Sequence, residues 1–99
     1  MKKIQTTKLF DNWFEKLRDN QAKAKIRARI QRAKLNNLGD CKPVGSGVSE
    51  MRIHYGAGYR IYFMQQGEEI IILLAGGDKS TQNQDIQIAL QIAEDIKRG

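Results

Sequence analysis

The sequence predicts an α+β domain in which a small antiparallel sheet carries a helical hairpin near its N-terminus. Three observations support this fold class. Apolar residues recur at helical spacing in the first third of the chain, residues 48–74 follow the patterns of strands, and helical spacing returns at the C-terminal end. A length of 99 residues fits a single domain, residues 1–99, with one core. The expected order of elements is β-α-α-β-β-β-α.

The N-terminal part is expected to form one short strand and two helices. Residues 3–7 are β-prone. The apolar residues that follow share one helical face: Leu9, Phe10, Trp13, Phe14 and Leu17. A second helix is expected from about Gln21 to Asn36, and Gly39 with Asp40 ends it. Only the pair Asp19-Asn20 separates the two helices, so they should form a hairpin.

Three strands joined by short turns are expected to form an antiparallel meander. Residues 48–55 and 59–65 alternate between apolar and polar side chains, with a glycine-rich turn between them. Residues 70–74 are continuously apolar, which is typical of a central strand buried on both sides. The segment Cys41–Val44 could add a further short strand. Gly76 and Gly77 are expected to lead out of the sheet into the last helix.

The charge distribution points to a polyanionic partner. The net charge is +6, but residues 1–60 carry 14 basic and 5 acidic side chains, whereas residues 61–99 carry 3 and 6. A basic half on a small domain is typical of proteins that bind nucleic acid. The single cysteine excludes an internal disulfide, and no window approaches the apolar length of a membrane span. The charged start of the chain is not followed by the apolar region of a signal peptide. We therefore expect a cytoplasmic protein with no membrane partner.

The second expected helix concentrates this charge. It contains six basic residues and no acidic one: Lys23, Lys25, Arg27, Arg29, Arg32 and Lys34. An exposed helix usually mixes charges of both signs to gain favourable pairs one turn apart. RNA, DNA or an acidic segment of a partner protein would compensate the repulsion, and the alternative is a solvated helix with no partner. Within this set, Lys23, Arg27 and Lys34 are the candidate RNA-binding residues.

Five side chains on or beside the strands are candidates for a catalytic site: Arg52, His54, Arg60, Tyr62 and Lys79. The alternation places the first two on one face of their strand and the next two on one face of the following strand. All four meet if the two alternations align across the turn at residues 56–58. Lys79 follows the third strand and should lie close to them.

These residue types suit cleavage of RNA by attack of a ribose 2′-hydroxyl on the neighbouring phosphate. Arg52 or Arg60 would hold the phosphate, because arginine stays charged and binds phosphate through two donors. His54 would serve as base or acid near neutral pH, and Tyr62 would stack on a base or donate a proton. Each residue also has an interpretation without catalysis. His54 would be a surface residue and Tyr62 a packing residue, and Glu50 would pair with an arginine and hold it in place.

No metal and no cofactor are expected at this site. One cysteine and one histidine do not make a convincing zinc site. Residues 76–80, Gly-Gly-Asp-Lys-Ser, contain residue types of a phosphate-binding loop, but they lack the spacing of a P-loop.

Several segments resemble the addiction-module killer branch of the RelE/ParE toxin superfamily. They are Gly39–Gly45, Val48–Ile53, Gly56–Phe63, Leu73–Gln82 with Asp85, Ile86 and Ala89, the early Phe10-x-x-Trp13, and Ala24-x-x-Arg27. The resemblance covers nearly the whole chain. It implies a small twisted antiparallel sheet with a helical hairpin on one side, and it implies the toxin of a type II toxin–antitoxin module.

The resemblance also implies roles for single residues. It places Arg60 at the sheet arginine that RelE-like toxins use on the scissile phosphate, and Lys79 close to a second basic residue. The chain departs from the RelE pattern in two places: Glu50 and Arg52 replace paired lysines, and Asp85 lies near the position of an expected tyrosine. His54 could then supply proton transfer by a HigB-like route. The resemblance further implies a cognate antitoxin with a helix-turn-helix domain.

Three functions stay open at this point. The first is a ribosome-dependent, metal-independent endoribonuclease that cuts mRNA and blocks translation, with the basic helix directed toward ribosomal RNA. The second is a ParE-like, non-enzymatic inhibitor of DNA gyrase. The third is a decayed toxin that keeps only antitoxin binding. The cluster of Arg52, His54 and Arg60 favours the first, because a gyrase inhibitor has no need of it.

Overall fold

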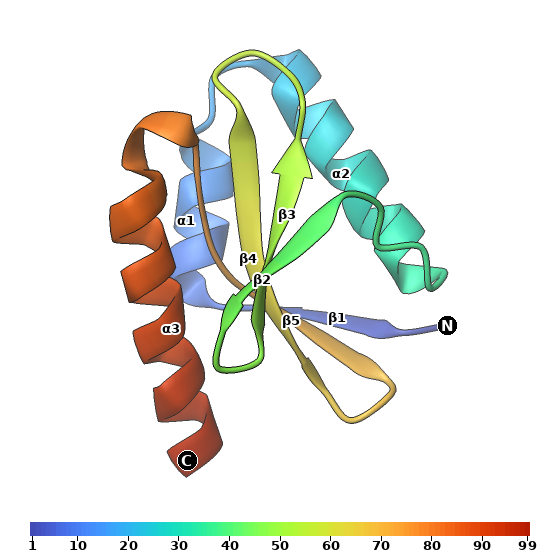
Figure 1. Cartoon of the computed structure of the whole chain (residues 1–99). Helices are drawn as coiled ribbons and strands as arrows, with labels where there is room; N and C mark the ends of the chain where they lie inside the picture. The colour runs from blue at the N-terminus through green and yellow to red at the C-terminus, as the bar shows by residue number, and fades with distance from the viewer.

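Helices cover both faces of one five-stranded sheet in a computed structural model that describes residues 1–99 (Figure 1). The elements in chain order are β1 (Lys3–Thr6), α1 (Lys8–Lys16), α2 (Asn20–Lys34), β2 (Cys41–Gly45), β3 (Val48–Ile53), β4 (Tyr59–Gln66), β5 (Ile70–Gly77), a 3₁₀ turn (Lys79–Thr81) and α3 (Gln82–Arg98). This confirms the α+β class. The strand that Cys41–Val44 could form is present as β2.

Side-chain caps fix where the first two helices begin. The Thr7 hydroxyl accepts a hydrogen bond from the backbone N–H of Phe10 at 3.1 Å. The Asp19 carboxylate accepts from the N–H groups of Gln21 and Ala22 at 3.0 and 3.1 Å. Each cap satisfies donors that the first turn of a helix leaves without partners. The short connection between α1 and α2 keeps both helices on the same face of the sheet.

The sheet is mixed, which corrects the expectation of a wholly antiparallel sheet. Its strand order is β1-β5-β4-β3-β2, and β1 pairs with β5 in parallel, with Ile4 opposite Ile71. The other three pairings are antiparallel, as the meander predicted. A parallel pair needs a long connection, and here the chain between β1 and β5 includes two helices and three strands.

Two apolar cores lie on opposite faces of the sheet. One packs α1 and α2 against the strands through Phe10, Ile26, Ala33, Met51, Ile53, Ile61, Phe63, Ile71 and Leu73. The other packs α3 through Val48, Tyr62, Met64, Ile72, Leu74, Ala75, Ala89 and Ala93. The alternation in residues 59–65 therefore predicted correctly which side chains of β4 lie on each face of the sheet. The apolar run in β5 is buried on both sides, as predicted.

Gly76 and Gly77 do not lead out of the sheet but form the last residues of β5. A Cβ at Gly76 would lie 2.2 Å from the Trp13 ring, and a Cβ at Gly77 would lie 1.7 Å from the Asp85 carboxylate. The absence of side chains lets α1 and α3 approach the strand closely from either face. No helix has both the length and the apolar composition needed to span a membrane.

Candidate functional site

A buried carboxylate on β3 organises the polar side chains of the α3 face. Glu50 is 1% exposed, and its Oε1 lies 3.1 Å from Arg52 Nε. Its Oε2 lies 3.5 Å from Arg60 Nε and accepts hydrogen bonds from the Tyr62 hydroxyl at 3.0 Å and from Gln82 Nε2 at 2.9 Å. The antiparallel register explains this cluster, because Glu50 stands opposite Tyr62 and Arg52 stands opposite Arg60. The reading that Glu50 holds an arginine in place is confirmed for both arginines.

Glu50 remains ionised because its partners outweigh its burial. Burial alone would raise the pKa of this carboxyl group. Hydrogen bonds from Gln82, Arg52 and Tyr62, together with the positive charge of Arg60, bring the pKa below its ordinary value. The cluster of one carboxylate and two guanidinium groups therefore keeps a net positive charge.

The lowered pKa of Glu50 gives a prediction for stability against pH. Folding favours the ionised form, so this contribution is complete above about pH 4.5, the ordinary value, and is lost as the pH falls through the lower pKa of the folded protein. Urea unfolding measured from pH 7 to pH 3 should show a steeper loss of stability for the wild type than for Glu50→Gln. Parallel curves for the two proteins would contradict the assignment.

Tyr62 is placed differently from the expectation. Its side chain is fully buried in the α3 core and its hydroxyl donates to Glu50. Burial, followed by the negative charge of Glu50, raises the pKa of this phenol well above its ordinary value. Stacking on an RNA base is therefore wrong for this conformation, and the proton of Tyr62 is held within the protein. Tyr62 acts on the site by holding Glu50.

Arg60 and Lys79 meet at a surface depression, which we call the Arg60 hollow. It has a volume of about 550 Å³ and is lined by His54, Tyr55, Gly56, Ala57, Gly58, Arg60 and Lys79. No acidic residue lines it. The side chain of Arg60 is only 14% exposed, and its Nη1 donates to the carbonyl of Gly58 at 2.7 Å. Its Nε is buried without a hydrogen-bond partner, and its only direct partner there is the charge of Glu50.

Gly58 makes this approach of the two cations feasible. Its φ of +77° lies in the left-handed region that favours glycine. A Cβ at this position would lie 3.3 Å from both Arg60 Nη1 and the Cβ of Lys79. The expectation that Lys79 lies close to Arg60 is therefore met by the structure.

His54 follows directly after β3, which ends at Ile53, and it lines the Arg60 hollow. His54 Nε2 lies 2.5 Å from Asp40 Oδ2, with the two side chains 73% and 48% exposed. The hydrogen bond with His54 lowers the pKa of Asp40, so the carboxylate stays charged and orients the ring. Nδ1 has no partner within the protein.

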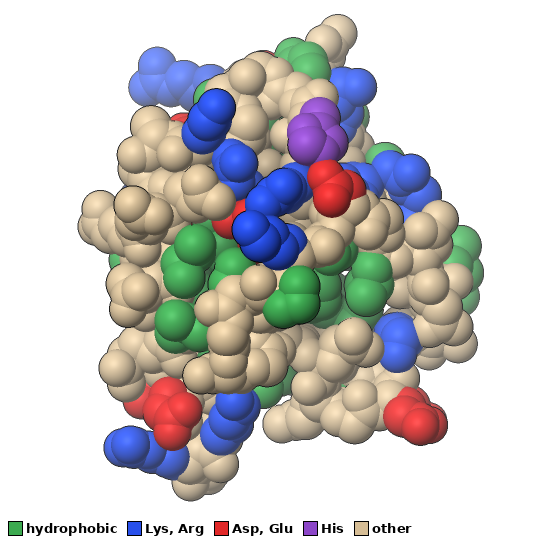
Figure 2. Space-filling view, in the orientation of Figure 1, with side chains coloured by type: hydrophobic (Ala, Val, Ile, Leu, Met, Phe, Trp, Pro, Cys, Tyr) green, Lys and Arg blue, Asp and Glu red, His purple; other side chains and the backbone are tan.

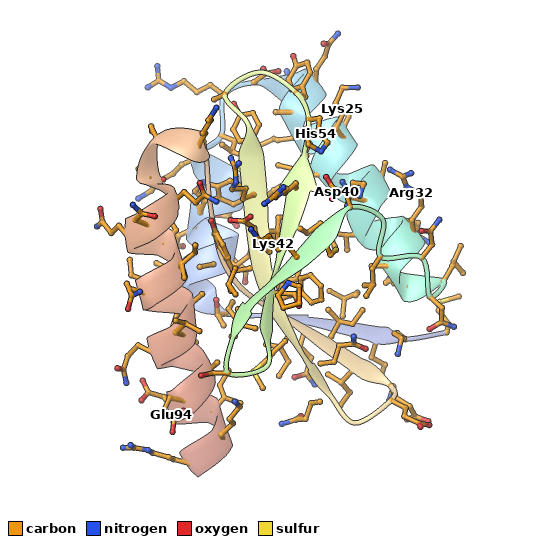
Figure 3. The ribbon with its side chains drawn as sticks, in the orientation of Figure 1. Lys25, Arg32, Asp40, Lys42, His54 and Glu94 are labelled. Atoms are coloured by element: carbon orange, nitrogen blue, oxygen red, sulfur yellow. The ribbon has the colours of Figure 1, made fainter.

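A second depression, which we call the α2 hollow, adjoins the first at His54. It has a volume of about 290 Å³ and is lined by Lys25, Ala28, Arg29, Arg32, Ile53 and His54. Figure 2 shows Lys and Arg side chains gathered around the one histidine on this face, and Figure 3 places His54 and Lys25 at the same end of α2. The cationic surface thus extends from β4 to α2.

The basic residues of α2 form two rows rather than one face. Lys23, Arg27 and Lys34 share one side at helical spacing, and Lys25, Arg29 and Arg32 share another. In the first row, Lys23 and Arg27 lie over the Phe14 ring at 5.4 and 5.0 Å from its centroid. This row, which was expected to bind RNA, lines neither hollow, and its contact with RNA stays a prediction.

Arg29 is buried and is not part of an exposed basic surface. It is 8% exposed, and its guanidinium donates to the backbone carbonyls of Arg52, Leu38 and Asp40. It thereby ties α2 to the start of β2 and to β3, and its charge lies beneath the α2 hollow. Gln82 and Asp40 were also not foreseen, since no local pattern links them to Glu50 or His54.

The side chains offer no donor set for a metal. No group of three or more His, Cys, Asp and Glu side chains lies close enough together to hold an ion. Cys41 is half-buried, and its Sγ lies 3.2 Å from the carbonyl of Leu38.

Comparison with known proteins places the chain in a family. A protein of Haemophilus influenzae, named only as an uncharacterized protein, is 50% identical over 93 residues, which is 94% of either chain. Residues 12–96 match the model of the phage-derived Gp49-like proteins (DUF891), and this range includes every residue of both hollows. The chain is therefore a member of the Gp49-like family of phage-derived proteins.

Proposed function

We propose that this protein is the toxin of a type II toxin–antitoxin module and cleaves mRNA on the ribosome. The observation that carries the proposal is the Arg60 hollow, in which Arg60 and Lys79 lie together and His54 stands at the rim. Such a hollow suits the phosphate of a single RNA strand, because two cations face it and no carboxylate lines it. Family membership supports the toxin role, since the Gp49-like family is related to RelE-like toxins.

The residues suggest how the chemistry would proceed. The 2′-hydroxyl oxygen attacks the neighbouring phosphorus, the bond to the 5′-oxygen breaks, and the products are a 2′,3′-cyclic phosphate and a 5′-hydroxyl. Arg60 and Lys79 would stabilise the additional negative charge of the transition state. His54, held by Asp40 through Nε2, would exchange a proton with the RNA through Nδ1. The leaving 5′-oxygen takes up one proton as the 2′-hydroxyl loses one.

The ribosome and the antitoxin complete the proposal as partners. The row formed by Lys23, Arg27 and Lys34 lies outside both hollows and offers charge to a larger polyanion such as ribosomal RNA. In the cytoplasm, a cognate antitoxin with a helix-turn-helix domain would neutralise the toxin. Its binding would keep the cationic surface from RNA until the antitoxin is removed.

Induced expression in cells tests this function. We expect growth arrest, with primer extension on a reporter mRNA showing cuts inside translated codons. The control is the same reporter with a disabled start codon, which ribosomes do not translate and which should stay intact. Arrest with intact mRNA and an induced SOS response would contradict the proposal and indicate gyrase. Absence of arrest at normal protein levels would indicate a toxin that has lost its activity.

A further inference from the structure

Two cationic hollows on this protein share one residue. The Arg60 hollow and the α2 hollow both include His54 in their walls. The catalytic account above uses only the first hollow. The second has a volume of about 290 Å³ and draws most of its lining from α2.

The lining of the α2 hollow suits an anion. Lys25 and Arg32 are exposed at its rim, and the charge of Arg29 lies beneath it. No acidic residue lines it. The carboxylate of Asp40 is bound to the lining residue His54 at 2.5 Å. Lys25 and Arg32 form no salt bridge within the protein, so their charges are available to a ligand.

Tyr55 connects the two hollows. It lines the Arg60 hollow, while Lys25 Nζ of the α2 hollow lies 5.3 Å from the centroid of its ring. Its hydroxyl is fixed by contacts with Gln21 at 3.0 Å and Asp19 at 3.3 Å. The surface from Arg60 to Arg32 is therefore continuous, with cations, a histidine and an aromatic ring in succession, as in grooves that bind single strands.

We propose that the α2 hollow is a second phosphate subsite, which holds a neighbouring nucleotide of the RNA strand bound at Arg60. The strand would pass His54 and Tyr55 and place another phosphate at Lys25 and Arg32. This inference rests on the proposed function, because it assigns the flanking part of the same substrate. A backbone with regularly repeated phosphates fits two separate cationic hollows better than a single small anion does.

Binding of two RNA probes tests the subsite. One is a single-stranded RNA of nine nucleotides and the other a dinucleotide with one phosphate, both carrying 2′-O-methyl groups that block cleavage. The pair Lys25→Gln/Arg32→Gln should weaken binding of the longer probe roughly tenfold, as removal of two exposed charges would, and leave the dinucleotide unaffected. For the longer probe, the slope of log K against log salt should become shallower by about 0.7 for each phosphate that the variant no longer neutralises.

The C-terminal end of α3 supplies a matched control, because no residue of this helix lines either hollow. Lys97→Gln/Arg98→Gln removes the same charge from two exposed residues that line neither hollow, and we expect it to change neither probe. Equal losses from both pairs would overturn the subsite in favour of a general effect of charge, and no loss from Lys25→Gln/Arg32→Gln would also overturn it. Arg60→Gln separates the two proposals, since it should weaken both probes. If it weakens neither, the proposed function fails as well.

Discussion

Replacing Arg60 by alanine is expected to reduce the rate of mRNA cleavage on the ribosome by about 10²–10³-fold, the usual loss when one transition-state donor is removed. Arg60 is fixed in its hollow, because Glu50 lies beside its Nε and the Gly58 carbonyl accepts a hydrogen bond from its Nη1. Induced expression of the variant should then no longer arrest growth. The rate is measured with programmed ribosomes and purified protein.

Arg60→Lys is the matched control for this prediction. It keeps the charge but loses the planar pair of donors, so an intermediate rate is expected. Thermal unfolding of both variants checks that the fold persists, since Arg60 also contacts the buried carboxylate. A folded Arg60→Ala protein that cleaves mRNA at the wild-type rate would contradict the role assigned to this residue.

Replacing Glu50 by alanine is expected to have the largest effect on stability. The change leaves Arg52 and Arg60 side by side on paired strands with no counter-charge, and it removes the acceptor of Tyr62 and Gln82. Breaking a buried ion pair by removing one partner costs about 3–5 kcal/mol, and we expect the lower end because both arginines keep some contact with solvent. The free energy of unfolding is measured in urea.

Two milder variants separate the parts of this network. Tyr62→Phe removes one hydrogen bond to Glu50 and should cost only about 1 kcal/mol. Glu50→Gln preserves the shape but not the charge, and under conditions where it is folded it should lower kcat for cleavage more than it changes KM. That split identifies Glu50 as a positioning residue for Arg60. Wild-type stability and kcat in Glu50→Ala would contradict the account.

Local periodicity was sufficient to predict most of the fold. The alternation in residues 59–65 separated Ile61 and Phe63 from Tyr62 and Met64, and these pairs do face different cores. The direction of β1 could not be predicted, because its partner β5 lies more than 60 residues away and no periodicity reports strand direction. The positions of Gly76 and Gly77 at the end of β5 leave room for the close approach of Trp13 and Asp85. These are tertiary contacts, which local sequence patterns do not report.

The candidate site was predictable only in part. Arg52, His54, Arg60 and Tyr62 were expected to meet through strand alternation and a short turn, and the register does place Arg52 opposite Arg60. His54 lies one residue beyond the end of β3 at Ile53, and a boundary of one residue is beyond what alternation resolves. Similarly, the spacing on α2 defines two basic rows, but only the packing of the helix decides which row faces His54.

The most direct test of the account uses an mRNA whose scissile nucleotide lacks its 2′-hydroxyl. Wild-type protein is added to ribosomes programmed with this mRNA or with the all-ribose mRNA. The account predicts that the all-ribose mRNA is cut, leaving a 5′-hydroxyl on the downstream fragment, and that the deoxy-substituted mRNA stays intact at that position. Cleavage of neither mRNA, or cleavage of both with 5′-phosphate products, would contradict it.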